Sequence, residues 1–195
     1  GTIGCFSFYP TKNLGALGDG GCITTNDSEI DFKVRQLRQY GWAQKYDQKI
    51  EGGRNSRLDE LQAGFLTLLM RDLDERNALR RSIVKKYCES GASVIHGGFS
   101  ESEKYVAHLA VCLVENRTDL MRKFADSDVS TGIHYPYLDT EFAANQSFSD
   151  AVLPISMAAK SKILTLPCFP ELTVREVDQV CRVISENVQY FESGQ

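Results

Sequence analysis

One lysine near the start of the chain has the surroundings that amine chemistry needs. Lys12 follows an apolar stretch, and the first carboxylate in the sequence is Asp19, seven residues later. A lysine that is partly removed from water can act as a nucleophile toward an aldehyde. The glycines at Gly15 and in the segment Gly18-Asp19-Gly20-Gly21 suit a backbone that turns tightly beside a bound group. The same residues also fit a solvated lysine in an ordinary hairpin, so this segment alone leaves both interpretations open.

Three further motifs follow this segment in a specific order. They are Asn55-Ser56-Arg57-Leu58-Asp59-Glu60-Leu61-Gln62-Ala63, then Gly132-Ile133-His134-Tyr135-Pro136, and finally Leu166-Pro167-Cys168-Phe169-Pro170-Glu171-Leu172-Thr173. Together with the lysine segment and its glycine turn, they resemble the motifs of the fold-type-I, PLP-dependent aminotransferases of the DegT/DnrJ/StrS type. The members of that family act on nucleotide-linked keto sugars. The four motifs spread over nearly all of the 195 residues, so the resemblance covers most of the chain.

The resemblance assigns roles to individual residues. Lys12 would form the Schiff base with PLP and act as the general acid–base for the proton that moves in transamination. Ser7 would donate its hydroxyl to the cofactor phosphate. Asn55 would reach the phosphate of the cofactor that a partner subunit holds. The residues expected near the sugar are Tyr9, His134 and Tyr135.

Two of these assignments have a structural alternative, and one region departs from the family pattern. Asn55 also fits a helix cap or a loop turn, and His134 also fits a structural histidine at a strand end. The family usually continues after the Tyr-Pro pair with a stretch that contains histidine or glutamine. This chain has Tyr137-Leu138-Asp139-Thr140-Glu141-Phe142 there, which leaves sugar contacts in that region open.

The resemblance also implies a fold and a domain organisation. In this family the lysine lies well past the midpoint of the large domain. The phosphate-binding turn, the ring that stacks on the cofactor and the aspartate that pairs with its pyridine nitrogen all precede it. The chain is therefore expected to be the carboxy-terminal half of an α/β enzyme. Residues 1–74 would be the end of the large domain with a connecting helix, and residues 75–195 a small α+β domain.

The implied activity is transamination of a nucleotide-linked keto sugar, with glutamate as amino donor, in the biosynthesis of amino sugars for polysaccharides or secondary metabolites. With Tyr9 in its tyrosine-or-histidine position, the lysine motif is most similar to that of the family members that aminate the 3-keto position of a dTDP-6-deoxyhexose. The enzyme would be a homodimer, because Asn55 would serve the neighbouring active site. A dehydratase relative has histidine in place of the lysine, and Lys12 argues against it. The alternative is a non-catalytic binding or dimerisation module that keeps only the fold.

Hydrophobic periodicity and turn residues predict the elements that carry these motifs. The expected strands are residues 4–9, 22–25, 105–114 and 129–135, the first of them buried, and residues 164–167 are expected to be a short extended segment. Six helices are expected. The first follows a cap formed by Asn26 and Glu29, the second begins at Ser56, and the third ends at Gly91. The fourth and fifth cover residues 118–125 and 156–163, and the last follows a capping box of Thr173 and Glu176. Residues 40–54 are expected to form a loop, and the charged residues 71–76 a kink or boundary.

Composition narrows the possible partners. A net charge of −4 with mixed signs argues against a nucleic-acid surface. No apolar run approaches the roughly 20 residues that cross a bilayer, and no leader opens the chain, so a cytoplasmic protein without a membrane partner is expected. The six cysteines form no CxxC pair, and none of the three histidines lies near a cysteine in a zinc-binding pattern, so we expect buried reduced thiols and no metal site.

Overall fold

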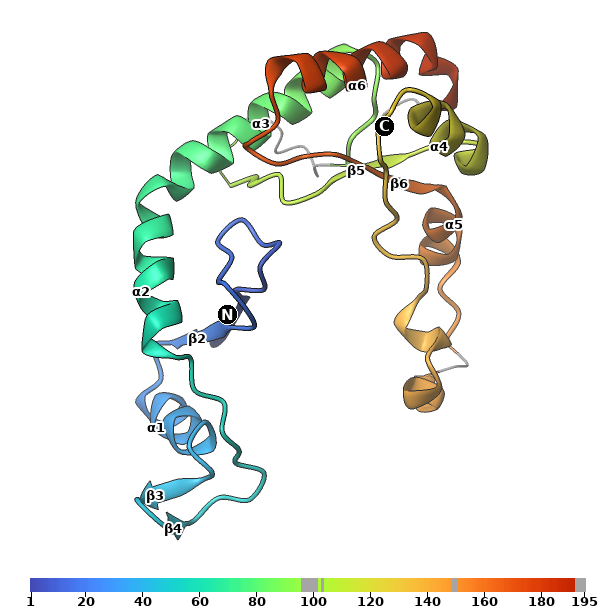
Figure 1. The fold of residues 1–195 in the computed structure, drawn as a ribbon. Helices are drawn as coiled ribbons and strands as arrows, with labels where there is room; N and C mark the ends of the chain where they lie inside the picture. The colour runs from blue at the N-terminus through green and yellow to red at the C-terminus, as the bar shows by residue number, and fades with distance from the viewer. Residues whose placement is uncertain (96–101, 103, 149–150, 192–195) are drawn as a thin grey trace. The chain divides into compact units, whose positions relative to one another are not determined.

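The computed structural model describes residues 1–95, 102, 104–148 and 151–191. The chain divides into two compact units, Gly1–Asp74 and Glu75–Gln195 (Figure 1). Each unit combines helices with short antiparallel strand pairs.

The first unit is built on a two-stranded antiparallel sheet. Strand β1 (Ile3–Ser7) pairs with β2 (Gly21–Thr25) along its whole length. The glycine-rich segment between them is therefore the loop that returns the chain. The other elements of this unit are α1 (Ser28–Leu37), β3 (Trp42–Gln44), β4 (Asp47–Gln48), α2 (Glu60–Leu69) and the 3-10 turn η1 (Met70–Asp72).

The sheet of the first unit is exposed, so the prediction of a buried first strand was wrong for this chain. Phe6 on β1 is 55% exposed and Ile23 on β2 is 47% exposed. Their apolar character fits a sheet that is covered on both faces, as parallel sheets of α/β proteins are. Within the first unit they are only about half covered.

Two helix starts lie later than predicted, and one predicted loop contains strands. Asp27, not Asn26, caps α1, because its Oδ1 accepts the backbone N–H groups of Glu29 and Ile30 at 2.9 and 3.2 Å. Helix α2 begins at Glu60 rather than Ser56, after an extended Asp59. Residues 40–54 contain the short hairpin of β3 and β4, in which the rings of Trp42 and Tyr46 meet edge to face at 5.3 Å.

The second unit holds a hydrophobic core to which three of its helices contribute side chains. Helix α3 (Leu73–Glu89) starts at the boundary and ends before Gly91, whose positive φ of +109° explains the predicted stop. The elements that follow are β5 (Ala110–Leu113), α4 (Arg117–Asp126), η2 (Asp139–Glu141), η3 (Ala143–Phe148), α5 (Pro154–Lys162), β6 (Ile163–Leu166), α6 (Val174–Glu186) and η4 (Val188–Tyr190). The largest fully buried side chains are Tyr87, Phe124, Leu120, Leu164, Leu166 and Ile184.

Helix α6 confirms the capping box. Thr173 accepts the N–H of Glu176, and the Glu176 carboxylate accepts the N–H of Thr173. On this helix Val180 and Ile184 are buried, whereas Val188 lies beyond the helix in η4 and is 45% exposed.

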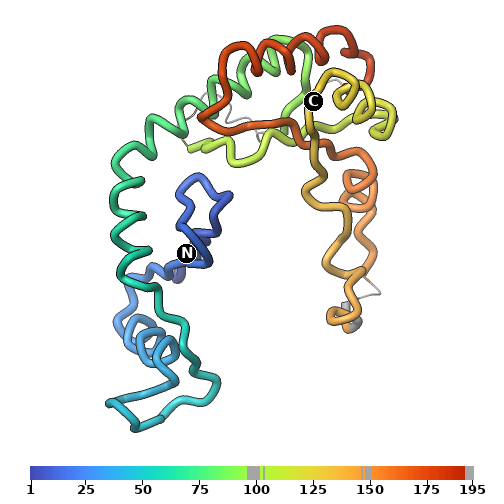
Figure 2. The backbone as a smooth tube through the Cα atoms, in the orientation of Figure 1, coloured from blue at the N-terminus to red at the C-terminus, as the bar shows by residue number. Residues whose placement is uncertain are grey.

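Two predicted strands are shorter than expected. Strand β5 covers Ala110–Leu113 instead of residues 105–114, because its antiparallel partner β6 offers four residues to pair with. Residues 129–135 contribute a single antiparallel bridge, between Gly132 and Thr165. The tube through these residues crosses β6 at that point (Figure 2).

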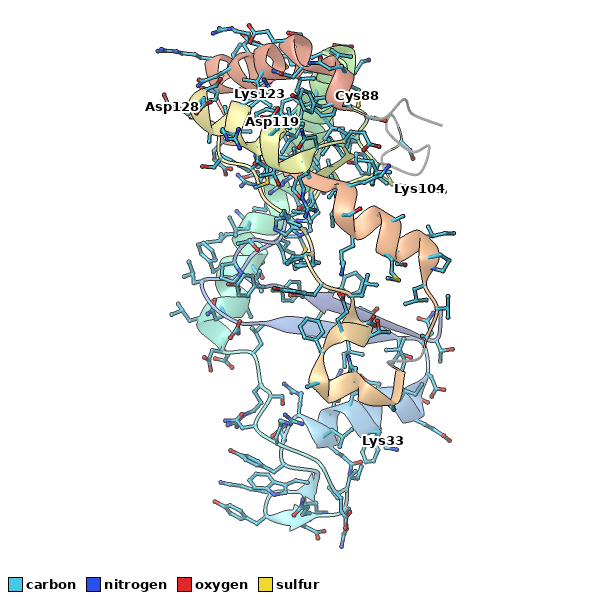
Figure 3. The ribbon with its side chains drawn as sticks, turned by 90° about the vertical axis from the view of Figure 1, so that its right-hand side faces the viewer. Lys33, Cys88, Lys104, Asp119, Lys123 and Asp128 are labelled. Atoms are coloured by element: carbon cyan, nitrogen blue, oxygen red, sulfur yellow. The ribbon has the colours of Figure 1, made fainter. Side chains whose placement is uncertain are left out.

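Helix α4 is joined to the end of the chain by polar contacts. Asp119 and Lys123 both lie on α4 (Figure 3). The hydroxyl of Tyr190 donates to the Asp119 carboxylate, and the Lys123 Nζ lies 5.7 Å from the centre of the Tyr190 ring. These contacts fix η4 against α4.

All six cysteines, each in the described part of the chain, are free thiols. Cys112 is buried as expected, but Cys5 and Cys22 are exposed, so that prediction was wrong for these two. The described residues contain no helix that is both long and apolar enough to cross a membrane. They also contain no group of three or more His, Cys, Asp or Glu side chains that could hold a metal ion.

Candidate active site

Lys12 lies in a loop that backbone hydrogen bonds close at its base. The loop joins β1 to β2, and the Phe8 N–H donates to the Gly20 carbonyl at 2.8 Å. Further in, the Ala16 N–H donates to the Phe8 carbonyl, and the Lys12 N–H donates to the Tyr9 carbonyl, both at 2.8 Å. The Lys12 residue is half-buried. The sequence therefore places the amine on a defined turn rather than on a freely moving segment.

The glycines of this loop are required by close backbone approaches. A Cβ at Gly15 would lie 2.4 Å from the Pro10 carbonyl oxygen, and one at Gly21 would lie 2.6 Å from the Phe6 carbonyl oxygen. Both distances are too short for any side chain. The glycine pattern noted in the sequence thus has a steric cause at these two positions.

The second motif supports the lysine loop. Gln62, on α2, accepts the Leu17 N–H at its Oε1 at 2.8 Å. A Cβ at Gly20 would come within 2.9 Å of the Leu58 side chain, so this glycine lets Leu58 approach the loop. Sequence reasoning missed both supporting residues. Leu58 lies before α2 and Gln62 within it, so no local periodicity relates the two, and the signal available in the sequence was that both belong to the second motif.

Ser7 and Asn55 are the two residues of the first unit that are expected to bind phosphate, and each has a polar side chain with a hydrogen-bond partner. Ser7 ends β1, and its Oγ accepts the Tyr9 N–H at 3.3 Å. Asn55 pairs with Gln39 in an antiparallel bridge, and its Oδ1 accepts the Arg57 Nε–H at 2.9 Å. With the amide oxygen occupied, the Asn55 NH₂ group is the part left to donate to an anion such as phosphate.

A groove of about 740 Å³ opens elsewhere on the first unit. It is lined by apolar residues of β1 and β2 and by basic side chains that include Arg35, Arg38 and Arg54. Ser7, Lys12 and Asn55 do not line it. The structure therefore brings Ser7, Tyr9 and Lys12 together in one loop region, and keeps Asn55 on a separate segment of the same unit.

His134 and Tyr135 belong to the second unit, where β6 holds the histidine. The His134 Nδ1 lies 2.9 Å from the Thr165 Oγ1. Two backbone hydrogen bonds between Gly132 and Thr165, at 2.9 and 2.8 Å, fix the segment that leads to the ring. Tyr135 is 66% exposed, and its ring meets the His134 ring edge to face at 5.3 Å.

The last motif is held by one helix of the second unit. The Tyr87 hydroxyl donates to the Pro167 carbonyl at 2.8 Å, the Arg80 Nη1 donates to the Cys168 carbonyl at 2.5 Å, and Arg76 forms an ion pair with Glu171. Burial raises the pKa of the Cys168 thiol to about 11, although the nearby Arg80 charge opposes that rise. Burial likewise raises the pKa of Tyr87. These groups stay protonated near neutral pH and serve the structure of α3 and the motif rather than acid–base chemistry.

The family model described as the DegT/DnrJ/EryC1/StrS aminotransferase family matches residues 1–185. The chain is 38% identical over 198 residues to dTDP-3-amino-3,6-dideoxy-alpha-D-galactopyranose transaminase of Aneurinibacillus thermoaerophilus, which covers 92% of this chain and 54% of that protein. The chain spans about half the length of the curated relatives it matches.

Solved structures agree with this match. A DegT DnrJ EryC1 StrS aminotransferase from Brucella abortus is similar with a TM-score of 0.86 at 29% identity, over 95% of this chain and 51% of that one. NtdA from Bacillus subtilis, with bound cofactor PMP, is similar with a TM-score of 0.83 at 27% identity, over 96% of this chain and 46% of that one. The expected fold class, that of a fold-type-I aminotransferase with mixed helices and strands, is confirmed.

Proposed function

The chain belongs to the DegT/DnrJ/EryC1/StrS aminotransferase family, and on this premise we propose that it forms part of a PLP-dependent enzyme that transfers an amino group to a nucleotide-linked keto sugar. The observation that carries the proposal is the loop around Lys12, which backbone hydrogen bonds, close-packed glycines and Gln62 of the second motif hold in place. A lysine amine on a fixed turn is what covalent attachment of an aldehyde cofactor needs.

The residues present fit the chemistry of PLP. The cofactor carries an aldehyde and a phosphate, and the chain offers the amine of the half-buried Lys12, a hydroxyl at Ser7 and an amide NH₂ at Asn55. Lys12 would hold the aldehyde and act as the general acid–base for the transferred proton. Ser7 and Asn55 would bind phosphate oxygens. When bound, PLP supplies the electron sink that transamination needs.

The substrate proposal rests on the family and on the named relative. The amino acceptor would be a dTDP-linked keto-6-deoxyhexose, in line with the transaminase from Aneurinibacillus thermoaerophilus. Glutamate would be the amino donor, as the resemblance implies. Tyr9, His134 and Tyr135 would contact the sugar, and both tyrosines are exposed and able to meet a ligand.

The assembly proposal follows from Asn55. Its NH₂ group would serve the cofactor of a partner subunit, so the working unit would be a cytoplasmic homodimer with residues 40–57 at or near the interface. In this proposal residues 1–74 are the end of the large cofactor-binding domain with its connecting helix, and residues 75–195 are the small domain.

The test is site-specific attachment of the cofactor in the full protein. Borohydride reduction after incubation with PLP is expected to fix the cofactor on Lys12, as peptide mass spectrometry would show. Lys12→Arg keeps the charge, and it is expected to abolish labelling and to lower kcat by about 10²–10⁴-fold or more, the range for losing a general acid–base. Lys33→Arg, on α1 (Figure 3), is the matched control and should leave both unchanged. Full transamination by Lys12→Arg would refute the role proposed for Lys12, whereas no transamination and no labelling in the unmodified protein would favour the binding-module alternative.

A further inference from the structure

The side chain of Thr165 is placed to control His134. Thr165 lies in the middle of β6 and is 5% exposed. Its backbone exchanges both hydrogen bonds with Gly132, two residues before the histidine. Its Oγ1 lies 2.9 Å from the His134 Nδ1. The strand thus holds both the backbone that leads to the imidazole and one ring nitrogen.

Gly132 makes room for the ring in this position. A Cβ at Gly132 would lie 3.1 Å from the His134 Cε1 and 3.5 Å from its Nδ1. The first distance is tighter than most real contacts, so a side chain at residue 132 would displace the ring from the threonine. The ring position therefore depends on two separate features, the missing side chain at Gly132 and the hydroxyl of Thr165.

The direction of the hydrogen bond follows from what else surrounds the hydroxyl. Among the residues that the structure describes, the His134 Nδ1 is the one hydrogen-bond partner of the Thr165 Oγ1. A hydroxyl has one proton to donate, and a buried donor without an acceptor is costly. If Nδ1 carried the proton and donated it, the hydroxyl proton would have no acceptor there. Donation from Thr165 to Nδ1 satisfies both groups.

We propose that Thr165 is a positioning residue that fixes His134 as the Nε2–H tautomer, so that Nε2 presents a hydrogen-bond donor to an acceptor oxygen of the sugar nucleotide. The assignment of a sugar-nucleotide ligand rests on the proposed function. The assignment of the tautomer rests on the contacts of Thr165, Gly132 and His134 alone. His134 is exposed, and with Nδ1 occupied, Nε2 is the ring nitrogen left to meet a ligand.

The tautomer is tested by nuclear magnetic resonance on the 195-residue chain with ¹⁵N-labelled histidine at pH 8. The chain has three histidines, and His134→Gln identifies the resonances of His134. We expect Nε2 to be protonated and Nδ1 to be unprotonated with the upfield shift of a nitrogen that accepts a hydrogen bond. Thr165→Val, which replaces the hydroxyl by a methyl group of similar size, should move the Nδ1 resonance downfield. Thr165→Ser should restore it.

Two results of this measurement would overturn the inference. One is a protonated Nδ1 in the unmodified chain, which needs no variant to observe. The other is an Nδ1 resonance that does not change in Thr165→Val while circular dichroism shows a folded chain. Neither result depends on whether the protein is an aminotransferase.

The role toward substrate is tested by kinetics on the full enzyme. Thr165→Val should raise the KM for the sugar nucleotide by about 3- to 10-fold, the range for one hydrogen bond, and leave the KM for the amino donor unchanged. In a His134→Ala background, Thr165→Val should have no further effect, because it acts through the imidazole. Additive effects, or a change in the amino-donor KM instead, would contradict the role. Complete absence of amino transfer by the unmodified enzyme would refute the proposed function and leave the tautomer result standing.

Discussion

At the scale of single residues, the candidate site is held in place by side chains to which we assign no catalytic or binding role. Gln62 and Leu58 hold the loop of Lys12, and Arg57 orients the amide of Asn55. Each contact fixes a candidate reactive or binding group in place. Active sites need this, because a group that is displaced by about 1 Å loses much of its rate advantage.

Gln62 is expected to matter through its acceptor oxygen. Gln62→Ala leaves the Leu17 N–H without its partner on α2, and we expect covalent PLP attachment at Lys12 to weaken by about 3- to 10-fold, the range for one hydrogen bond. Hydrogen exchange at the Leu17 amide should become faster. Gln62→Glu keeps an acceptor oxygen at the same place and is the matched control. Equal behaviour of the two variants in PLP titration and exchange would show that the contact is unimportant.

The sequence could predict the candidate residues of this site but not the contacts between motifs. The lysine turn and its glycines are local features, and the structure shows the steric reason for Gly15 and Gly21. The hydrogen bond from Leu17 to Gln62 joins residues 45 apart, and the contact of His134 with Thr165 joins residues 31 apart. Such contacts depend on how the elements pack, so no local pattern indicates them.

At the scale of elements, helices depend mainly on contacts between residues close in sequence, whereas strands depend on pairing with distant residues. Helix α6 was predicted with its capping box because a cap is a contact within four residues. Strand β5 was predicted too long because the length of its partner, β6, decides how many residues can pair. The hairpin of β3 and β4 was missed because it has so few residues and is held partly by aromatic contacts.

The capping box of α6 makes a testable contribution to stability. Thr173→Ala removes the side chain that accepts the Glu176 N–H, and we expect the free energy of unfolding to fall by about 1 kcal/mol in urea titrations. Thr173→Ser keeps the hydroxyl and should lose less. An alanine variant as stable as the unmodified chain would contradict the capping role.

The same box gives a pH dependence with a definite sign. Hydrogen bonds from the Thr173 side chain and backbone hold the pKa of Glu176 below its ordinary value of 4.5. A carboxylate whose pKa is lower in the folded state stabilises the fold above its ordinary pKa, and that stability is lost as the pH falls through the folded value. Glu176→Gln should therefore lose less stability than the unmodified chain when urea titrations are repeated below pH 4.5.

At the scale of the whole molecule, the two units differ in how far they bury their own apolar residues. The core cluster of buried hydrophobic residues lies entirely in the second unit. In residues 1–74, all of which the structure describes, Ala16 and Leu66 are the hydrophobic side chains that are buried. An exposed apolar strand pair offers open edges to another chain. We therefore propose that further protein covers β1 and β2 in the functional assembly.

The two exposed cysteines can test this cover on both faces of the sheet. Cys5 pairs with Ile23, and Cys22 pairs with Phe6, so Cys5 and Cys22 lie on opposite faces because successive side chains of a strand alternate. In the 195-residue chain at pH 8, iodoacetamide should modify both quickly. Cys168 should react slowly, because burial raises its pKa to about 11 and the thiolate is the reactive form.

A longer protein of the relatives' length should protect these two cysteines. If the amino-terminal half of the large domain packs on both faces of β1 and β2, Cys5 and Cys22 should react at least about tenfold more slowly there, which corresponds to about 1.4 kcal/mol of local opening. Mass spectrometry over a time course measures each cysteine separately, and the same reaction in urea, where all six should react, is the control. Protection of one cysteine alone would mean that only one face is covered. Unchanged rates for both would show that the sheet stays exposed in the longer protein, and would contradict the proposal that these residues form the end of a larger domain.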